Sequence, residues 1–423
     1  MTFSESLTRL KTGFARSFWV ANTLELFERL AFYGAKAVLA IYLVEKVGLG
    51  PTGNTLIGLY TFAVFFLPIL AGTIVDRYGF KRSLLACFFI FSLGYFAVGL
   101  AGMAGAAPLV DGVGRLPYTV GALLLTAIGG SLIKPCIVGT VARTTNESTK
   151  ALGYSIYYTL VNLGGAIGPI LALPVRENLG IEYVLVTSAV VSFANFLATL
   201  FFFEEPQGAA PVPAGVMPRT FGRVFADMML VFGNVRFISF LVIFSGYWVM
   251  FWQIFFSLPF YVRDVLNFPK FEIIETVDAA TLILVTVPVA ALTKRLSPIS
   301  AMALGFAISS ASWLVVASVV SIPVTVLAIA CFAVGEAMQA PRFYEYVADL
   351  APRHQVGTFM GFAFLPVAIG SLLAGPLSGW LVAHYIKGSA RPGGMWVVCA
   401  VIGFAATALM LLHDRVYRRA QSA

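Results

Sequence analysis

The chain has 423 residues, of which 59% are hydrophobic and only 11% are charged, and its mean hydropathy is +0.88. A soluble domain carries about a quarter charged residues, so the composition excludes a soluble globular protein and indicates a membrane protein. The net charge of +8 does not indicate a nucleic-acid partner, because the basic residues fall mostly in short loops. The four cysteines lie in apolar segments without paired spacing, so we expect no disulfide framework, metal site or cofactor.

Twelve apolar runs, each long enough to cross a bilayer as a helix, follow one another along the chain. They lie at about 17–44, 54–75, 83–105, 116–141, 152–174, 181–203, 236–262, 275–293, 298–320, 323–348, 356–384 and 394–413. A Pro/Ala/Gly-rich stretch after the sixth run is typical of a flexible linker. We therefore predict an all-α membrane protein with 12 transmembrane helices in two pseudo-symmetric six-helix bundles. The predicted parts are residues 1–203, a cytoplasmic linker at 204–235, and residues 236–423.

The distribution of basic residues predicts the orientation. Seventeen of the 28 Lys and Arg residues fall on the side of the N-terminus, and seven fall on the other side. Loops rich in Lys and Arg stay in the cytoplasm, so we expect both termini and the linker there, in a plasma membrane.

An internal repeat relates the two halves. Pro135 precedes Pro169 by 34 residues, and Pro341 precedes Pro376 by 35. The second proline of each pair follows a small-xxx-small pattern. The repeat therefore pairs the fourth and fifth runs with the tenth and eleventh.

The first apolar run carries an unusual group of ionisable residues: Glu25, Glu28, Arg29 and Lys36, with Tyr33 beside them. Charges in hydrocarbon cost at least about 2.5 kcal/mol each, so these side chains are expected to face protein or a watery cavity. One reading is a structural ion-pair cluster that pins helices together. We favour the other reading, a helix that lines a solute path.

Three polar residues lie within other runs. Lys134 and Glu336 lack a partner on their own helix, so each is expected to interact with a residue across the bundle. We predict that their charged ends approach each other, and that a cavity lies between the two halves. Asn162 is either a helix–helix hydrogen bond or a ligand contact.

Five further charged residues are expected in supporting positions. Arg342 and Glu345 can pair at i, i+3, and with Asp349 they fit a structural role or a cytoplasmic gate. Glu275 and Asp278 are expected at the mouth of the path.

The loop between the second and third runs resembles the G-x-x-x-D-R-x-G-x-K/R-R signature of the major facilitator superfamily. The matching residues, which we expect to act in conformational gating, are Gly72, Asp76, Arg77, Gly79 and Arg82. Asp76 can accept hydrogen bonds from a neighbouring helix end, and Gly79 permits a tight turn.

Further motifs resemble those of the proton-dependent oligopeptide transporter family within that superfamily. They are Glu25-xx-Glu28-Arg29-xxx-Tyr33-Gly34, Ile133-Lys134-Pro135-Cys136, Tyr158-xxx-Asn162-x-Gly164, Gly335-Glu336 and Ala374-Gly375. The resemblance implies a proton-coupled symporter of di- and tripeptides that works by alternating access. It implies that Arg29 and Lys134 bind the peptide carboxylate, and that Glu336 binds the amine. It also implies that Glu25, Glu28 and Glu336 take part in proton coupling.

Other residues are expected to contribute to substrate binding: Tyr33, Lys36, Tyr158, Asn162, Trp252 and Gln253. Two features depart from the family pattern. Lys36 stands where the family has an arginine, and the seventh run, Ser245 to Tyr261, contains no acid. The alternative is therefore a carrier or exporter of another small metabolite or drug, with or without proton coupling.

An enzyme is not expected, since no nucleophile elbow, phosphate loop or metal-ligand cluster occurs. We expect a monomer whose partners are its solute, protons and the lipid bilayer.

Overall fold

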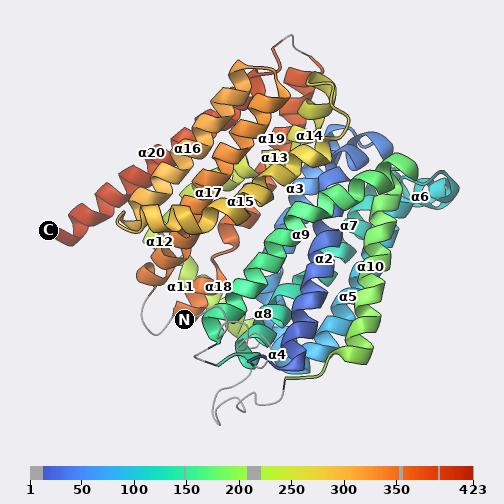
Figure 1. Cartoon of the computed structure of the whole chain (residues 1–423), viewed down its shortest axis with the longest axis horizontal. Coiled ribbons are helices and arrows are strands. Elements are labelled where there is room, and N and C mark those ends of the chain that lie inside the picture. The colour runs from blue at the N-terminus through green and yellow to red at the C-terminus, as the bar shows by residue number, and fades with distance from the viewer. Residues whose placement is uncertain (1–12, 147–148, 207–220, 352–355, 389–390, 423) are drawn as a thin grey trace. The chain divides into compact units, whose positions relative to one another are not determined.

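A computed structural model describes residues 13–146, 149–206, 221–351, 356–388 and 391–422 (Figure 1). Every regular element in these residues is a helix, as the predicted all-α fold requires. Ten helices of the described residues are long and apolar enough to cross a membrane, and a pair bent by 42° counts as an eleventh if it forms one span. The bent pair is α3 (Pro51–Phe66) and α4 (Pro68–Tyr78). The first helix, α2 (Arg16–Ile41), has the length of a span and carries the charges noted above, so it completes the expected twelve.

The observed spans follow the predicted runs closely. In the first half they are α5 (Phe80–Leu100), α7 with α8 (Arg115–Ser131 and Ile133–Thr144), α9 (Lys150–Asn178) and α10 (Ile181–Phe202). In the second half they are α12 to α14 (Val235–Phe251, Gln253–Phe256 and Leu258–Phe260), α15 (Phe271–Thr293), α16 (Pro298–Ser318), α17 (Ile322–Leu350), α18 with α19 (Val356–Gly361 and Leu365–Leu381) and α20 (Gly394–Ser422). Two short helices were not expected: α6 (Ala107–Val113), and α11 (Phe221–Phe232) within the predicted linker. The Pro/Ala/Gly stretch of that linker, residues 207–220, lies outside the described residues.

The chain forms two compact units. Unit 1 comprises residues 1–35 and 67–224, and unit 2 comprises residues 36–66 and 225–423. Helix α2 therefore contributes its first part to unit 1 and its last part to unit 2. The predicted division into residues 1–203, a linker at 204–235 and residues 236–423 stays a prediction.

Local geometry agrees with an internal repeat. Within unit 2, the first and seventh spans both end in a π-helical turn, Tyr42–Lys46 and Tyr261–Val265. Each turn is followed two residues later by a residue with positive φ, Gly48 at 79° and Asn267 at 54°. Because two segments far apart in sequence share this unusual geometry at one offset, the end of each span has the same local design.

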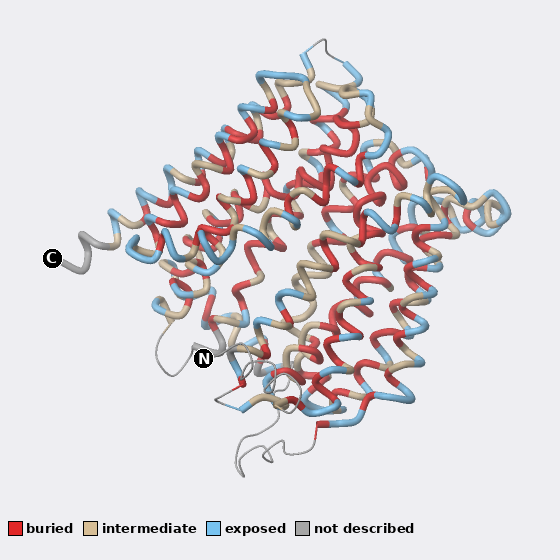
Figure 2. Tube along the Cα trace, in the orientation of Figure 1, coloured by how far each residue is buried: buried red, intermediate tan, exposed pale blue. Residues whose placement is uncertain are grey.

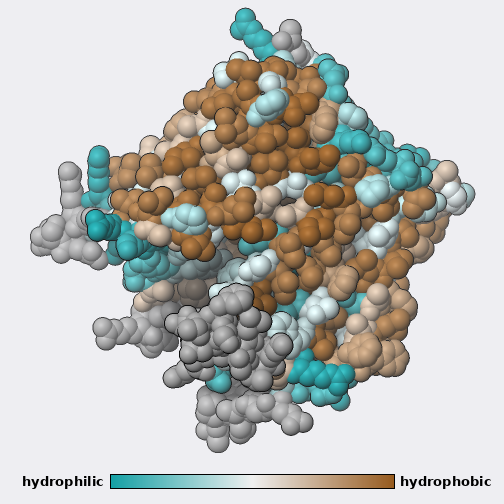
Figure 3. All heavy atoms as spheres, viewed as in Figure 1, coloured by the Kyte–Doolittle hydropathy of each residue, from teal (hydrophilic) through white to brown (hydrophobic). Residues whose placement is uncertain are grey.

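Both units bury apolar cores and expose apolar side chains. Figure 2 shows where buried and exposed residues lie along the trace. In unit 1, α5 packs between α7 and α10; in unit 2, α19 packs against α3 and α12, and α17 packs against α15 and α16. Large apolar side chains are nevertheless exposed on α15, such as Leu284, Val287 and Leu292. Figure 3 shows hydrophobic side chains over much of the face that it displays. A lipid environment accounts for such surface, because lipid tails take the place of a protein neighbour.

Candidate functional site

Helix α2 places an ion-paired arginine inside unit 1. The Arg29 Nε lies 3.3 Å from a Glu25 carboxylate oxygen and also donates to the Glu28 carboxylate. All three side chains are buried. The arginine is held by acids one residue and one turn before it, so the charge that α2 carries into the interior is locally neutralised.

Lys134 joins this group from another helix. It lies at the start of α8, just after the break in the fourth span at Leu132. It interacts electrostatically with Glu25, Glu28 and Arg29. Lys134 therefore interacts with residues of another helix, α2. We name these four residues the α2 charge cluster: Glu25, Glu28, Arg29 and Lys134.

Close helix packing positions Arg29. At Gly164 of α9, an added Cβ atom would overlap the Arg29 side chain. A residue with no side chain is therefore required where α9 crosses α2. The same face of α9 carries Tyr157, which is buried and interacts electrostatically with Arg29.

Tyr157 was missed by the sequence prediction, which chose Tyr158. Tyr158 is 56% exposed. The signal was available, because Tyr157 lies seven residues before Gly164 and so shares its helix face. Tyr33 is half-buried and also interacts with Arg29. Asn162 is half-buried, and its side chain makes no hydrogen bond within the part of the chain that the structure describes, so the helix–helix alternative is not seen there.

A second group of buried charges lies in unit 2 around Lys36. The Lys36 Nζ lies 3.7 Å from the ring centroid of Trp252 and 4.0 Å from that of Phe255. It interacts electrostatically with Glu275 and Asp278 of α15 and with Glu336 of α17. We name these the α15 charge cluster: Lys36, Glu275, Asp278 and Glu336.

The expectation that Glu275 and Asp278 lie at the mouth of a path is wrong. Their exposed fractions are 2% and 5%. Helical geometry explains this, since residues at i and i+3 share a face, and here that face is turned toward α17 and Lys36 instead of solvent.

Trp252 and Gln253 stand at the break between α12 and α13, and both are fully buried. The Trp252 indole donates to the Val367 carbonyl at 3.2 Å. The Gln253 amide donates to the Val249 and Ala374 carbonyls, each at 3.2 Å. These bonds would have to be exchanged before either polar group could bind a solute, so their role as ligands stays a prediction.

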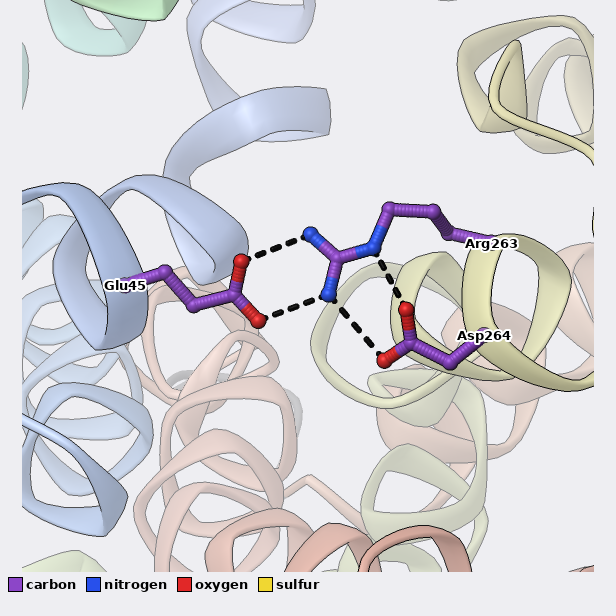
Figure 4. Close-up of polar contacts among 3 residues, drawn as sticks. All are labelled: Glu45, Arg263 and Asp264. Atoms are coloured by element: carbon purple, nitrogen blue, oxygen red, sulfur yellow. Dashed lines mark hydrogen bonds and ion pairs between the residues drawn. The ribbon is translucent and has the colours of Figure 1, made fainter.

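An ion-pair clasp joins the ends of the first and seventh spans in unit 2 (Figure 4). The Arg263 guanidinium donates to both Glu45 carboxylate oxygens, at 2.6 and 2.7 Å. It also donates to Asp264 at 2.6 and 3.0 Å. Sequence analysis missed this clasp; the signal was an acid at the same position of both π-helical turns, Glu45 and Asp264.

The superfamily signature loop behaves partly as expected. Gly79 makes the tight turn at φ 81°. The acceptor at the start of α5 is Glu205, whose carboxylate accepts from the Phe80 and Lys81 amides at 2.8 Å each. Asp76 was predicted to cap a helix end. It is exposed, and its carboxylate makes no hydrogen bond to any residue in the described ranges, so Glu205 fills that role here.

The remaining members of the loop are Gly72, Arg77 and Arg82. The two arginines are exposed, and an added Cβ at Gly72 would meet nothing within 4 Å. Their gating role stays a prediction. Arg342 pairs with Glu345 at 2.6 Å and donates to the Thr293 carbonyl at 3.0 Å, which confirms the expected i, i+3 pair.

No cluster of three or more His, Cys, Asp or Glu that could hold a metal ion occurs in the described ranges. The predicted Lys134–Glu336 approach joins residues of different units, and it stays a prediction together with the cavity between the halves.

A helical chain with this many apolar spans, a repeated helix-end geometry and buried charge clusters has the architecture of a polytopic membrane transporter. The chain belongs to the Major Facilitator Superfamily, whose profile matches residues 24–365 and 271–423. The resemblance to this superfamily that the sequence suggested is thereby confirmed.

Solved structures share its fold. One is a POT family transporter in complex with a thioalcohol-conjugated peptide, with a TM-score of 0.77, 16% identity and coverage of 95% of this chain and 96% of that one. Another is the POT family transporter PepTSo, with a TM-score of 0.76, 18% identity and coverage of 96% and 98%. Among curated proteins, Multidrug resistance protein MdtH of Salmonella newport (strain SL254) is 23% identical over 397 residues, covering 92% of this chain and 93% of MdtH.

Proposed function

We propose that this protein is a proton-coupled symporter of small zwitterions, with di- and tripeptides as the foremost class. The observation that carries the proposal is the α2 charge cluster, in which a buried arginine is paired with two carboxylates beside a lysine. Similar folds belong to a POT family transporter bound to a conjugated peptide and to another bound to 5-aminolevulinic acid.

The chemistry of the cluster suits a proton-dependent anion site. While Glu28 is ionised, it occupies the Arg29 guanidinium. Once a proton neutralises Glu28, the guanidinium can take a solute carboxylate by a charge-assisted hydrogen bond. Proton and solute then favour the same state, which is the positive linkage that symport requires, typically about 1–3 kcal/mol.

Two further charged residues bind the solute in this proposal. Lys134 adds a second cation for the carboxylate, and Glu336 takes the solute amine. The protein works by alternating access as a monomer in the plasma membrane, a bacterial inner membrane in a bacterial cell, with both termini in the cytoplasm. The asymmetry of its basic residues supports this orientation.

The first test is a binding and exchange assay on the purified protein. Di- and tripeptides are expected to raise its melting temperature, and to exchange with labelled dipeptide across proteoliposome membranes. Peptides amidated at the C-terminus, which lack the carboxylate, are expected to do neither. Equal responses to the free and the amidated peptides would contradict a carboxylate site at Arg29.

The second candidate is a drug exporter, as the name of the MdtH relative suggests for that protein. The observation favouring it is a cluster of aromatic rings around Trp252: the half-buried Trp248 and the buried Phe251, Phe255 and Phe256. An exporter of this kind would be stabilised by lipophilic cations such as tetraphenylphosphonium, and peptides would have no effect.

A further inference from the structure

One face of α15 buries three acids. Glu272, Glu275 and Asp278 follow one another at intervals of three residues, so they share a helix face. Each is at least nine-tenths buried. Glu336 interacts with Asp278 from α17, and the buried Tyr247 of α12 interacts with both of these residues. Four carboxyl groups are therefore gathered within unit 2.

Lys36 supplies positive charge to Glu275, Asp278 and Glu336. Two arginines of unit 2 pair with other groups: Arg263 with Glu45 and Asp264, and Arg342 with Glu345 and the Thr293 carbonyl. One ammonium cannot offset three ionised carboxylates, those of Glu275, Asp278 and Glu336, in a low-dielectric interior, where each uncompensated charge is strongly unfavourable.

Hydrogen bonding leaves the same acids unsatisfied. Neither carboxylate oxygen of Glu275 accepts a hydrogen bond from any residue that the structure describes, and one oxygen of Asp278 is likewise without a donor. Buried polar groups are ordinarily paired, and in a cluster with one lysine for three acids these oxygens indicate a missing positive ligand. The group of acids does not have the arrangement of a metal site within the described residues, which favours a proton as that ligand.

Protonation of these acids would change their attraction for Lys36. It lies on the last part of α2 and is held over the Trp252 and Phe255 rings. An ionised Glu275 or Asp278 attracts its ammonium and so holds α2 toward α15; a protonated acid does not. We propose that Glu275 and Asp278 form a proton-binding site whose occupancy controls, through Lys36, how firmly the end of α2 is held against α15.

This inference deepens the proposed function. The bound proton itself is a property of the folded protein, whereas its use in driving solute uptake rests on the proposed symport. Two measurements separate these claims.

The first is infrared pH-difference spectroscopy of the purified full-length protein. We expect the protonated-carboxyl band of the wild type to lose intensity in Glu275→Gln and in Asp278→Asn. In Lys36→Met the band should persist to higher pH, because the ammonium that favours ionisation is gone. The matched control is Asp111→Asn. Asp111 is exposed, and a 2.7 Å hydrogen bond from Arg115 holds the pKa of Asp111 below its usual value, so it should contribute no such band near neutral pH.

The second measurement is transport in proteoliposomes. Asp278→Asn is expected to reduce pH-gradient-driven accumulation at least tenfold while leaving solute exchange without a gradient within about twofold of the wild type. If wild-type protein exchanges no peptide, the proposed function fails and the infrared result still decides on the proton site. An infrared band unchanged in Glu275→Gln, Asp278→Asn and the double variant would overturn the inference.

Discussion

The α2 and α15 charge clusters differ in how their charges balance. The α2 charge cluster sets two acids against two bases, with the arginine in direct contact with both acids. The α15 charge cluster sets three acids against one lysine, and that lysine lies against aromatic rings. A balanced cluster can keep every group ionised, and it changes only when something competes for a partner. An unbalanced cluster needs an added positive charge.

This difference assigns separate tasks to the two clusters. The α2 charge cluster suits exchange, in which a solute carboxylate replaces a protein carboxylate on Arg29. The α15 charge cluster suits uptake of a proton at Glu275 and Asp278, and of the solute amine at Glu336. A symporter of zwitterions needs a site for the solute carboxylate, a site for the solute amine and a site for its proton.

The substitution expected to disturb the charge balance of the α2 charge cluster most is Arg29→Ala. This change leaves Glu25 and Glu28 buried without their partner, and breaking a buried ion pair costs about 3–5 kcal/mol. We expect solute binding to be lost and the melting temperature to fall sharply, measured by thermal unfolding of the purified protein. The matched control, Arg115→Ala, removes an exposed arginine paired with Asp111 and should leave stability nearly unchanged. A stable Arg29→Ala protein with unaltered binding would remove Arg29 from the site.

A gentler change is Glu28→Gln, which mimics a permanently protonated acid. Exchange of labelled solute should persist, because Arg29 is free. Accumulation driven by a pH gradient should fall at least tenfold, the loss expected from a coupling free energy of about 1.4 kcal/mol or more. Proteoliposomes with and without an imposed gradient provide the measurement. Undiminished concentration of solute by the variant would place the coupling proton elsewhere, with Glu25 as the next residue to test.

The positioning of the α2 charge cluster can be tested at Gly164. An added methyl group in Gly164→Ala would overlap the Arg29 side chain and push α9 away from α2, with an expected loss of about 1–3 kcal/mol. The control is Gly121→Ala on α7, where an added Cβ meets nothing within 4 Å. Chemical denaturation in detergent compares the two variants. Equal stabilities would show that α9 does not fix Arg29.

The smallest effect is expected at the clasp between Glu45 and Arg263. These side chains are partly exposed, 37% and 27% respectively, and exposed pairs contribute about 0.2–1 kcal/mol. Arg263→Gln should therefore lower the melting temperature slightly, and the loss should shrink at high salt. A loss as large as that of Arg29→Ala would contradict the contrast between buried and exposed pairs.

The sequence predicted what depends on local spacing. Apolar run lengths located the spans, and helical spacing found the pair of Arg342 with Glu345. Such pairs lie within one or two turns, so their partners are fixed by the helix itself.

The sequence did not predict what depends on the packing of distant segments. Glu205 lies 125 residues from the Phe80 amide that donates to it, and Arg263 lies 218 residues from Glu45. The burial of Glu275 could not be inferred either, since a charged residue near a helix end is equally compatible with solvent. Only the neighbours that pack against a helix decide which of its polar faces is enclosed.

The most direct test of the account is the pH dependence of dipeptide affinity in the wild type and in Glu28→Gln. In the wild type, a proton on Glu28 frees Arg29, so affinity should be high at low pH and fall as rising pH ionises Glu28. In Glu28→Gln this competition is absent, so affinity should stay high and change much less over the same range. Calorimetric titration of the purified proteins at a series of pH values supplies the measurement. Parallel pH profiles in the two proteins would contradict competition between Glu28 and the solute for Arg29.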